Sequence, residues 1–345
     1  MATNNPPPPS TCAISVIIPM YNTEKYIGEC LESLANQTFQ DFDVIIVDDC
    51  STDNSREIVQ SFFAKFGDRL TLAKLSEHVG RPGVSRNFAL NMARGKYVYF
   101  LDSDDFIAPD ALENFYAVAE KFDADVIQTE GYFEFQDELG KESSKLMSYQ
   151  TGGFVTAPTL EIFDIGARVK GFTQKRFMWE IGGKFVRLKF LRANKITFPA
   201  LKVWEDFVFA FECLVAAKNY VRVPFYFYYY RKREGSVSSP TTDPMRFMEN
   251  IIDVVKSAND FMSGRKFFED NPQYKFMVTD FFMQNSLNVF SKFFVDNGHD
   301  VGGLYNFLSK GVFSHRTQDI AALTAYLFEA ATLSKINTNH LEVSN

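Results

Sequence analysis

The sequence predicts an α/β protein with a mainly parallel sheet, helices on both sides of that sheet, and a helical C-terminal extension. Short β-branched segments alternate with segments of helical spacing through the first half of the chain, which is typical of such a sheet. Two of the buried strand candidates end in acidic residues. From about Pro244 onward, apolar residues recur at helical spacing, which predicts the extension.

The first elements follow from hydrophobic patterns. Residues 14–18 form a β-branched segment that stops at Pro19. Residues 25–36 carry apolar side chains three or four positions apart, which predicts a helix. Residues 44–47 are continuously apolar, as expected for a strand covered on both faces, and two aspartates follow them.

The alternation continues as far as residue 127. Residues 70–75 and 97–101 predict strands, residues 84–93 predict a helix, and Pro109 opens another helix. The carboxyl ends of parallel strands face one crevice, so the acids that follow two of these strands are expected to meet there.

The middle of the chain is less regular. Residues 131–174 are rich in Gly, Ser and Thr, and residues 205–217 predict a helix. Residues 221–230 form an aromatic strand candidate with Pro224 inside it, which predicts an edge strand or a broken one.

Composition excludes several classes of protein. The chain has 46% hydrophobic residues and a formal net charge of -7, so it is globular and unsuited to non-specific binding of nucleic acid. Its four cysteines and four histidines are dispersed without zinc-site spacing, which favours a reducing compartment. No signal peptide or membrane-spanning run is expected, so we predict a cytoplasmic protein and leave open peripheral contact with the inner membrane face.

Carboxylates at the ends of buried strands are the most informative feature. Placing Asp102, Asp104 and Asp105 beside a hydrophobic sheet is costly unless something compensates their charge. A divalent cation carrying a nucleotide diphosphate would do so, because Mg²⁺ and Mn²⁺ prefer hard oxygen ligands. The alternative is that these acids cap the helix opened by Pro109.

Further motifs accompany these acids in a fixed order and spacing. They occupy residues 15–22, 47–53, 83–87 and 95–105. Together they closely resemble glycosyltransferase family 2, whose members have the A-type fold, a Rossmann-like sheet. The resemblance is specific over residues 14–125, weaker over residues 183–238, and absent beyond.

The resemblance implies how a UDP-sugar donor binds. Pro19 and Tyr21 match the loop that borders the uracil and the ribose. Asp49 matches the acid that accepts a hydrogen bond from the uracil ring, with Asp48 beside it. Arg86 matches an arginine on the nucleotide side; without the surrounding motif it would be interpreted as a surface arginine paired with an acid.

The segment Asp102–Ser103–Asp104 matches the DxD motif of the family. The resemblance implies that Asp104 is the direct ligand of Mn²⁺ or Mg²⁺. It also implies that Asp102 reaches the ribose or a metal-bound water, so that both acids belong to the metal site.

An acid pair at a predicted helix start matches the acceptor side of the family. Asp206 is the first candidate for the catalytic base and Glu205 the second. A base must reach the acceptor hydroxyl by a hydrogen bond, whereas acids in the first turn of a helix also simply complement its dipole. The run Arg231–Arg233 fits either a diphosphate contact or a solvated turn.

The predicted function is an inverting glycosyltransferase that moves a hexose or N-acetylhexosamine from a UDP-sugar to an acceptor hydroxyl. The resemblance makes bacterial surface-glycan synthesis the usual role, with a glycan or lipid-linked glycan as acceptor. The alternatives are a non-catalytic nucleotide-sugar-binding or scaffold protein with the same fold, and a nucleotidyltransferase. The latter should carry a glycine-rich, lysine-containing loop after the first strand, which residues 20–24 lack.

These assignments divide the chain into regions. Residues 1–12 are predicted to be a disordered proline-rich arm, and residues 13–240 the catalytic domain. Within that domain, residues 13–130 form the nucleotide-sugar half and residues 131–240 the acceptor half. Residues 241–345 are predicted to be helical and rich in phenylalanine, which favours core packing and leaves a homodimer open.

Overall fold

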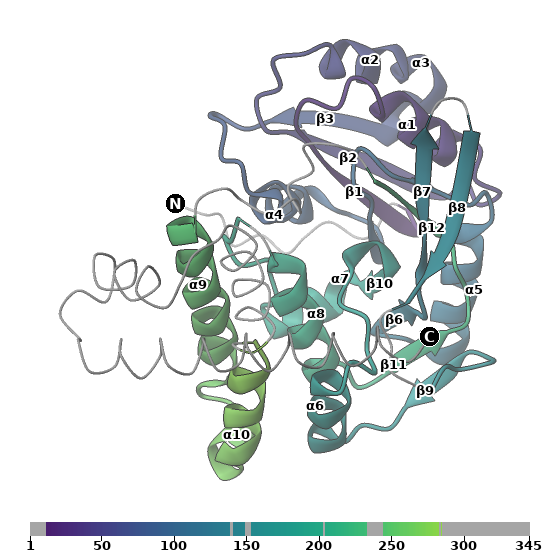
Figure 1. The fold of residues 1–345 in the computed structure, drawn as a ribbon. Coiled ribbons are helices and arrows are strands. Elements are labelled where there is room, and N and C mark those ends of the chain that lie inside the picture. The colour runs from purple at the N-terminus through teal and green to yellow at the C-terminus, as the bar shows by residue number, and fades with distance from the viewer. Residues whose placement is uncertain are drawn as a thin grey trace, which may run out of the picture. The chain divides into compact units, whose positions relative to one another are not determined.

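The chain divides into two compact units, Met1–Ser236 and Val237–Asn345. The computed structural model describes residues 12–138, 141–148, 153–202, 204–232, 244–282 and 284 (Figure 1). The second unit contains α9 (Pro244–Met262) and α10 (Lys266–Asp270) among its described residues, as the helical pattern predicted. The proline-rich arm, Arg233 and most of the phenylalanine-rich tail lie outside the described residues.

The first unit is built on an eight-stranded sheet, counted over the described residues, in the order β3-β2-β1-β4-β10-β6-β11-β9 (Figure 1). β10 runs antiparallel to its two neighbours and β9 runs antiparallel to β11, whereas the other pairs are parallel. This confirms the predicted mainly parallel α/β sheet. The strands are β1 (Ile14–Met20), β2 (Phe42–Asp48), β3 (Leu70–Lys74), β4 (Tyr97–Phe100), β6 (Val126–Thr129), β9 (Thr159–Glu161), β10 (Lys184–Arg187) and β11 (Tyr220–Val223).

A second sheet of four described strands has the order β5-β12-β7-β8. The sequence did not predict it, because most of it falls in the segment that looked irregular. The aromatic stretch around Pro224 breaks there, as predicted, and supplies one strand to each sheet. The strands of the second sheet are β5 (Phe106–Ile107), β7 (Tyr132–Glu138), β8 (Lys141–Met147) and β12 (Tyr228–Arg231).

Helices connect these strands and cover the large sheet. They are α1 (Ile27–Ala35), α2 (Ser55–Ser61), α3 (Phe63–Phe66), α4 (Pro82–Met92), α5 (Ala111–Phe122), α6 (Ile165–Thr173), α7 (Leu188–Asn194) and α8 (Glu205–Ala216), with 3-10 turns at Gly67–Arg69 and Ile181–Gly183. The helices predicted at residues 25–36 and 84–93 are thus confirmed within a few residues.

Both faces of the sheet are covered. Consecutive residues of a strand point to opposite faces. The ring of Tyr99 packs against Phe115 of α5 at 5.4 Å, while the ring of Phe100 packs against Phe209 of α8 at 5.6 Å. α5 and α8 therefore lie on opposite faces, which explains why the central strands are continuously apolar.

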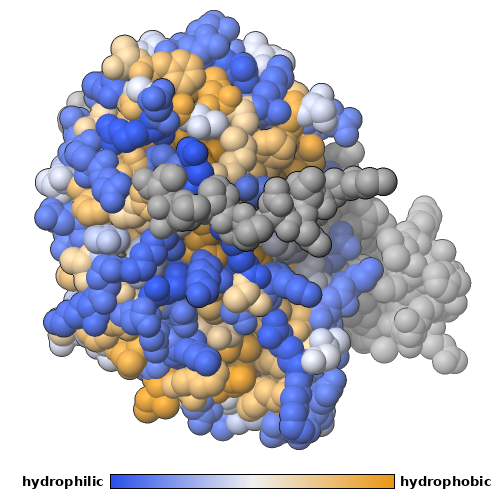
Figure 2. All heavy atoms as spheres, turned by 180° about the vertical axis from the view of Figure 1, so that it is seen from behind, coloured by the Kyte–Doolittle hydropathy of each residue, from blue (hydrophilic) through white to orange (hydrophobic). Residues whose placement is uncertain are grey.

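The strand register brings the acidic segments to one edge. Met20 at the end of β1 pairs with Asp48 at the end of β2, and Ile17 pairs with Phe100 at the end of β4. The acids that follow β2 and β4 therefore lie on either side of the chain leaving β1, as the parallel arrangement predicted. On the face seen in Figure 2, hydrophilic and hydrophobic residues are interspersed. None of the described helices is both long and apolar enough to cross a membrane.

Candidate active site

The loops that follow β1 and β2 are held together by backbone-to-side-chain hydrogen bonds. The Asn22 N–H donates to Ser51 Oγ at 3.0 Å, and the Thr52 N–H donates to Asn22 Oδ1 at 2.8 Å. The Thr23 N–H donates to Ser55 Oγ at 2.8 Å. These bonds fix the loop that carries Tyr21, next to the half-buried Pro19.

Asp48 is fully buried and both its carboxylate oxygens have partners. Ser51 N–H donates to one oxygen at 2.9 Å, and Arg56 Nη1 lies 3.0 Å from the other. The hydrogen bond and the ion pair of Asp48 therefore stabilise the loop after β2. A direct contact between Asp48 and the donor remains a prediction.

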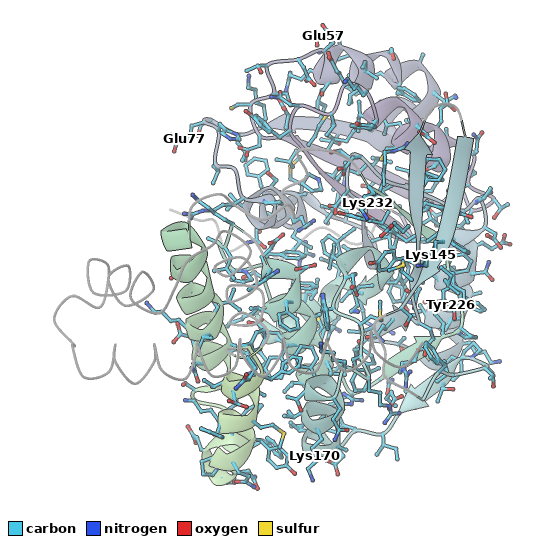
Figure 3. All side chains as sticks on the ribbon, viewed as in Figure 1. Glu57, Glu77, Lys145, Lys170, Tyr226 and Lys232 are labelled. Atoms are coloured by element: carbon cyan, nitrogen blue, oxygen red, sulfur yellow. The ribbon has the colours of Figure 1, made fainter. Side chains whose placement is uncertain are left out.

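Asp49 organises the loop that precedes α4. Its two carboxylate oxygens accept the N–H groups of Val79 and Gly80, each at 2.7 Å. His78 Nδ1 lies 3.0 Å from the Asp49 carbonyl oxygen, and the His78 ring stacks on Tyr21 with centroids 4.0 Å apart. The side chain of the preceding residue, Glu77, points outward from this loop (Figure 3). His78 thus joins Tyr21 and Asp49, a grouping that no sequence motif had indicated.

Arg86 of α4 links the two acidic groups of the site. Its Nη2 lies 2.6 Å from Asp102 Oδ1, and its Nη1 lies 2.7 Å from Glu205 Oε1. Only 3% of Arg86 is exposed, so it is not a surface arginine. Burial lowers the pKa of Arg86, but the carboxylates of Asp102 and Glu205 outweigh this effect and raise it.

Local packing explains how Arg86 of α4 comes close enough to pair with Glu205 of α8. A Cβ atom at Gly83 would lie 2.9 Å from Phe198 Cβ and 3.1 Å from Glu205 Cγ, so only glycine allows this approach. Asn87 exchanges two hydrogen bonds with the Phe198 backbone, at 2.7 and 2.9 Å. The Arg86 guanidinium lies 5.2 Å from the centre of the Phe198 ring. The GVSRN motif at residues 83–87 is therefore a packing motif as well as a charged one.

The second sheet holds the turn that contains the DxD motif. Asp105 is 2% exposed and accepts hydrogen bonds from the Tyr228 hydroxyl and, at 2.7 Å, from the Arg231 N–H. Burial raises the pKa of Asp105 well above its usual range, and the charges of Asp104 and Asp102 raise it further. The motif thus has a buried fourth residue that anchors the half-buried acids on either side of Ser103.

Arg231 does not belong to a solvated turn, whereas a contact between this run and the diphosphate stays a prediction. It is 5% exposed, pairs with Glu29, and donates from Nε to the Asp104 carbonyl oxygen at 3.1 Å. The next residue, Lys232, has a 63% exposed side chain (Figure 3). Arg231 is therefore a buried support for the DxD turn, whereas Lys232 is largely exposed and lies 3.6 Å from Glu134 Oε1.

The acid pair predicted for the acceptor side, Glu205 and Asp206, begins α8. Burial raises the pKa of Asp206 to about 8, assisted by the neighbouring Glu205 charge. Burial also raises the pKa of Glu205, although Arg86 opposes it. Among the groups whose charges interact with Asp206, burial raises the pKa of Glu180 to about 7 and lowers that of Lys184 to about 8. Glu180 Oε2 is buried and makes no hydrogen bond in the described part of the chain.

Three of the six non-glycine residues with positive φ angles among the described residues lie next to the segments of the site. Asn22, Cys50 and Trp204 have positive φ angles of 50°, 63° and 65°. Non-glycine residues rarely adopt this left-handed conformation, and such strain is often found at functional sites. Each of the three lies next to one of the segments described above: the β1 loop, the β2 acids and the acid pair of α8.

The helix-capping alternative for the DxD acids is not supported. α5 has Asp110 at its N-cap, and β5 separates that helix from the acids. The acid pair, by contrast, does complement the helix dipole, since Glu205 and Asp206 occupy the first turn of α8. Its role as catalytic base stays a prediction.

Carboxylate oxygens at the DxD turn are of the type that Mg²⁺ and Mn²⁺ prefer. No cluster of three or more His, Cys, Asp or Glu that could bind a metal occurs among the described residues. A site with one or two carboxylates suits these ions when a bound diphosphate and water supply the other ligands. Asp104 and Asp102 fit that arrangement.

Comparisons with known proteins bear on this geometry. A family model described as Glycosyl transferase family 2 matches residues 15–181. Glycosyltransferase GlyG of Streptococcus pneumoniae is 30% identical, over 70% of this chain and 77% of its own length. The chain belongs to glycosyltransferase family 2.

Other relatives in the family act on teichoic-acid polymers. A poly(ribitol-phosphate) beta-glucosyltransferase of Bacillus spizizenii is 34% identical over 73% of this chain. The match covers 38% of that longer protein. The structure of Staphylococcus aureus TarS residues 1–349 in complex with UDP-GlcNAc superposes with a TM-score of 0.66 at 26% identity, covering 93% of this chain and 87% of that one. The predicted A-type fold is thereby confirmed.

Replacing Tyr228 by Phe should destabilise the DxD turn. The buried Asp105 carboxyl would lose a hydrogen-bond partner, at a cost of about 1–3 kcal/mol in the free energy of unfolding. Tyr229→Phe is the matched control, because the Tyr229 hydroxyl makes no hydrogen bond in the described part of the chain. Chemical denaturation measures both variants. Equal stability of the two variants would contradict this role of Tyr228.

Proposed function

We propose that this family 2 member is an inverting transferase that moves a hexose or N-acetylhexosamine from a UDP-sugar to an acceptor hydroxyl. The observation that carries the proposal is the Arg86 ion-pair bridge. It joins the DxD acid Asp102 to Glu205, next to the candidate base Asp206, although these residues lie far apart in sequence. Donor and acceptor functions need such proximity, since the base activates the hydroxyl that attacks the same carbon atom from which the diphosphate leaves.

Donor binding is assigned to the edge formed by the loops after β1, β2 and β4. Tyr21, stacked on His78, offers an aromatic surface to the uracil, and Pro19 borders it. Asp49 has both oxygens engaged by backbone N–H groups, yet each carboxylate oxygen has a second lone pair for the uracil ring. The TarS structure with UDP-GlcNAc supports a uridine donor.

We assign a divalent cation, Mn²⁺ or Mg²⁺, to Asp104, with Asp102 as second ligand or as partner of a metal-bound water. When bound, such an ion would neutralise charge on the leaving diphosphate. Asp104 is half-buried, and the side chain of Asp102 is 32% exposed, so both remain accessible to a ligand. Ser103, Asp105 and Arg231 would hold the turn rather than touch the ion.

In the proposed reaction, Asp206 accepts the proton of the acceptor hydroxyl. The hydroxyl oxygen forms a bond to the anomeric carbon, while the bond from that carbon to the diphosphate oxygen breaks and UDP leaves. A single displacement inverts the configuration. The raised pKa of Asp206 suits a base, because its ionised form then binds a proton strongly near neutral pH. Glu205, engaged by Arg86, would position Asp206.

The acceptor is assigned to the class of surface glycans and glycan-like polymers. Relatives that act on poly(ribitol-phosphate) support a polymer with free hydroxyl groups as acceptor. All four cysteines are free thiols, which fits synthesis in the reducing cytoplasm. Peripheral membrane contact and a homodimer through the C-terminal helices remain proposals that concern the second unit.

Release of UDP from a panel of UDP-, GDP- and dTDP-sugars, with Mn²⁺ or Mg²⁺, tests the donor proposal. We expect slow metal-dependent hydrolysis of a UDP-sugar, reduced at least about a hundredfold by Asp104→Ala because charge on the leaving group is no longer balanced. Lys232→Ala, an exposed neighbour of the site, is the control. Absence of turnover with every donor would instead favour the non-catalytic alternative.

The pH dependence of UDP release tests Asp206 as base. The base must be ionised, so kcat/KM should rise about tenfold per pH unit below its pKa of about 8 and level off above it. Asp206→Asn should remove this rise and lower kcat by about a hundredfold or more. A variant that retains the wild-type pH profile would exclude Asp206 as the base.

A further inference from the structure

Arg86 forms ion pairs with acids from two separate elements. It comes from α4, while Asp102 follows β4 and Glu205 begins α8, 16 and 119 residues away in sequence. The planar guanidinium has its donors in a fixed fork, so one side chain can hold two carboxylates at once. Because Arg86 is 3% exposed and the Glu205 side chain is 8% exposed, the Arg86–Glu205 ion pair is shielded from bulk water and is stronger than a surface pair.

The two partners differ in their access to ligands. The Asp102 side chain is 32% exposed, whereas that of Glu205 is 8% exposed. A ligand can therefore engage Asp102 while Glu205 stays enclosed against Arg86. When Asp102 turns its charge to a bound ligand, Glu205 becomes the main counter-charge of Arg86.

Packing keeps the guanidinium in place when this happens. Arg86 lies over the Phe198 ring, and Asn87 fixes the Phe198 backbone with two hydrogen bonds. Gly83 brings the start of α4 against the same segment. The nitrogen Arg86 Nε is buried and makes no hydrogen bond in the described part of the chain, so one donor is left over.

We propose that Arg86 is a positioning residue that couples the two halves of the site. When the metal-bound donor occupies Asp102, Asp102 compensates less of the Arg86 charge, and the electrostatic attraction of Arg86 for Glu205 and Asp206 becomes stronger. The proposal rests on the function proposed above. Its consequence is that the acceptor side becomes competent after the donor has bound. By linkage, changes on the acceptor side must alter donor and metal affinity by the same factor.

The effect on the base has a definite sign. Arg86 favours the ionised form of Asp206, against burial and the charges of Glu205 and Glu180. Lys184, nearby in β10, also carries positive charge when protonated. When Asp102 turns from Arg86 to a ligand, its negative charge offsets less of the Arg86 charge, so Arg86 attracts the ionised forms of Glu205 and Asp206 more strongly. Donor binding should therefore favour ionisation of Asp206, at the moment when a base is needed.

The test measures Mg²⁺ binding to the full chain at saturating UDP, by calorimetry near pH 9, about one unit above the pKa of Asp206. UDP is used because it has no sugar to contact the acceptor side. Glu205→Gln should raise the Mg²⁺ concentration for half-saturation about fivefold or more. Without the Glu205 charge, Arg86 holds Asp102 more tightly and repels the cation.

Asp206→Asn is the matched control, because it neutralises the adjacent acid, which makes no ion pair with Arg86. Because Asp206 acts on Arg86 only through space, we expect its shift in the Mg²⁺ requirement to be in the same direction but less than about half of that in Glu205→Gln. Equal shifts of the Mg²⁺ requirement in both variants would mean that any lost negative charge near the site has the same effect, without a special role for the Arg86–Glu205 ion pair. No shift in Glu205→Gln would exclude the coupling. Either result overturns the proposal.

Arg86→Gln gives a second, opposite prediction. Removing the cation frees Asp102, so the Mg²⁺ requirement should fall, and adding Glu205→Gln to this variant should have no further effect. Thermal unfolding establishes whether each variant is folded; if Arg86→Gln is not, the comparison of Glu205→Gln with Asp206→Asn decides. Failure of the wild-type protein to bind UDP with Mg²⁺ would count against the proposed function instead.

Discussion

Carboxylates gathered at one edge of an apolar sheet create a charge that the fold must compensate, and the rest of the site follows from how it does so. Burying an ionised carboxylate without partners costs several kcal/mol, on the order of a protein's whole stability. Asp48 is balanced by Arg56, and Asp49 by backbone N–H groups. Asp105 is held by Tyr228 and a backbone N–H. Asp102 instead shares a single cation with Glu205.

This difference separates structural acids from acids that can act on a ligand. Asp48 and Asp105 are themselves buried, have partners on both carboxylate oxygens and mainly shape loops. Asp102 is partly exposed, and Asp104, two residues further on, is half-buried. The second sheet contributes by fixing the DxD turn through Arg231 and Tyr228. The acids that can act on a ligand are thus held in place by buried acids that have partners of their own.

Much of this could be predicted from the sequence, because local patterns determine it. Continuous apolar runs predicted the central strands, and parallel strands bring their ends to one edge, so the meeting of the acids followed. The partners of those acids could not be predicted. The pairing of Arg86 with Glu205 spans 119 residues, and the Tyr228 contact to Asp105 spans 123. Such contacts depend on tertiary packing, and neither Tyr228 nor His78 belongs to a motif that would reveal it.

The anomeric configuration of the sugar first released by hydrolysis tests the central claim most directly, because water can replace the unknown acceptor. Proton NMR would follow the sugar before the two anomers equilibrate. A single displacement assisted by Asp206, acting on an α-linked UDP-sugar, predicts that the β-anomer appears first and the α-anomer grows in later. Initial release of the α-anomer would contradict both the inverting reaction and the role of Asp206 as its base.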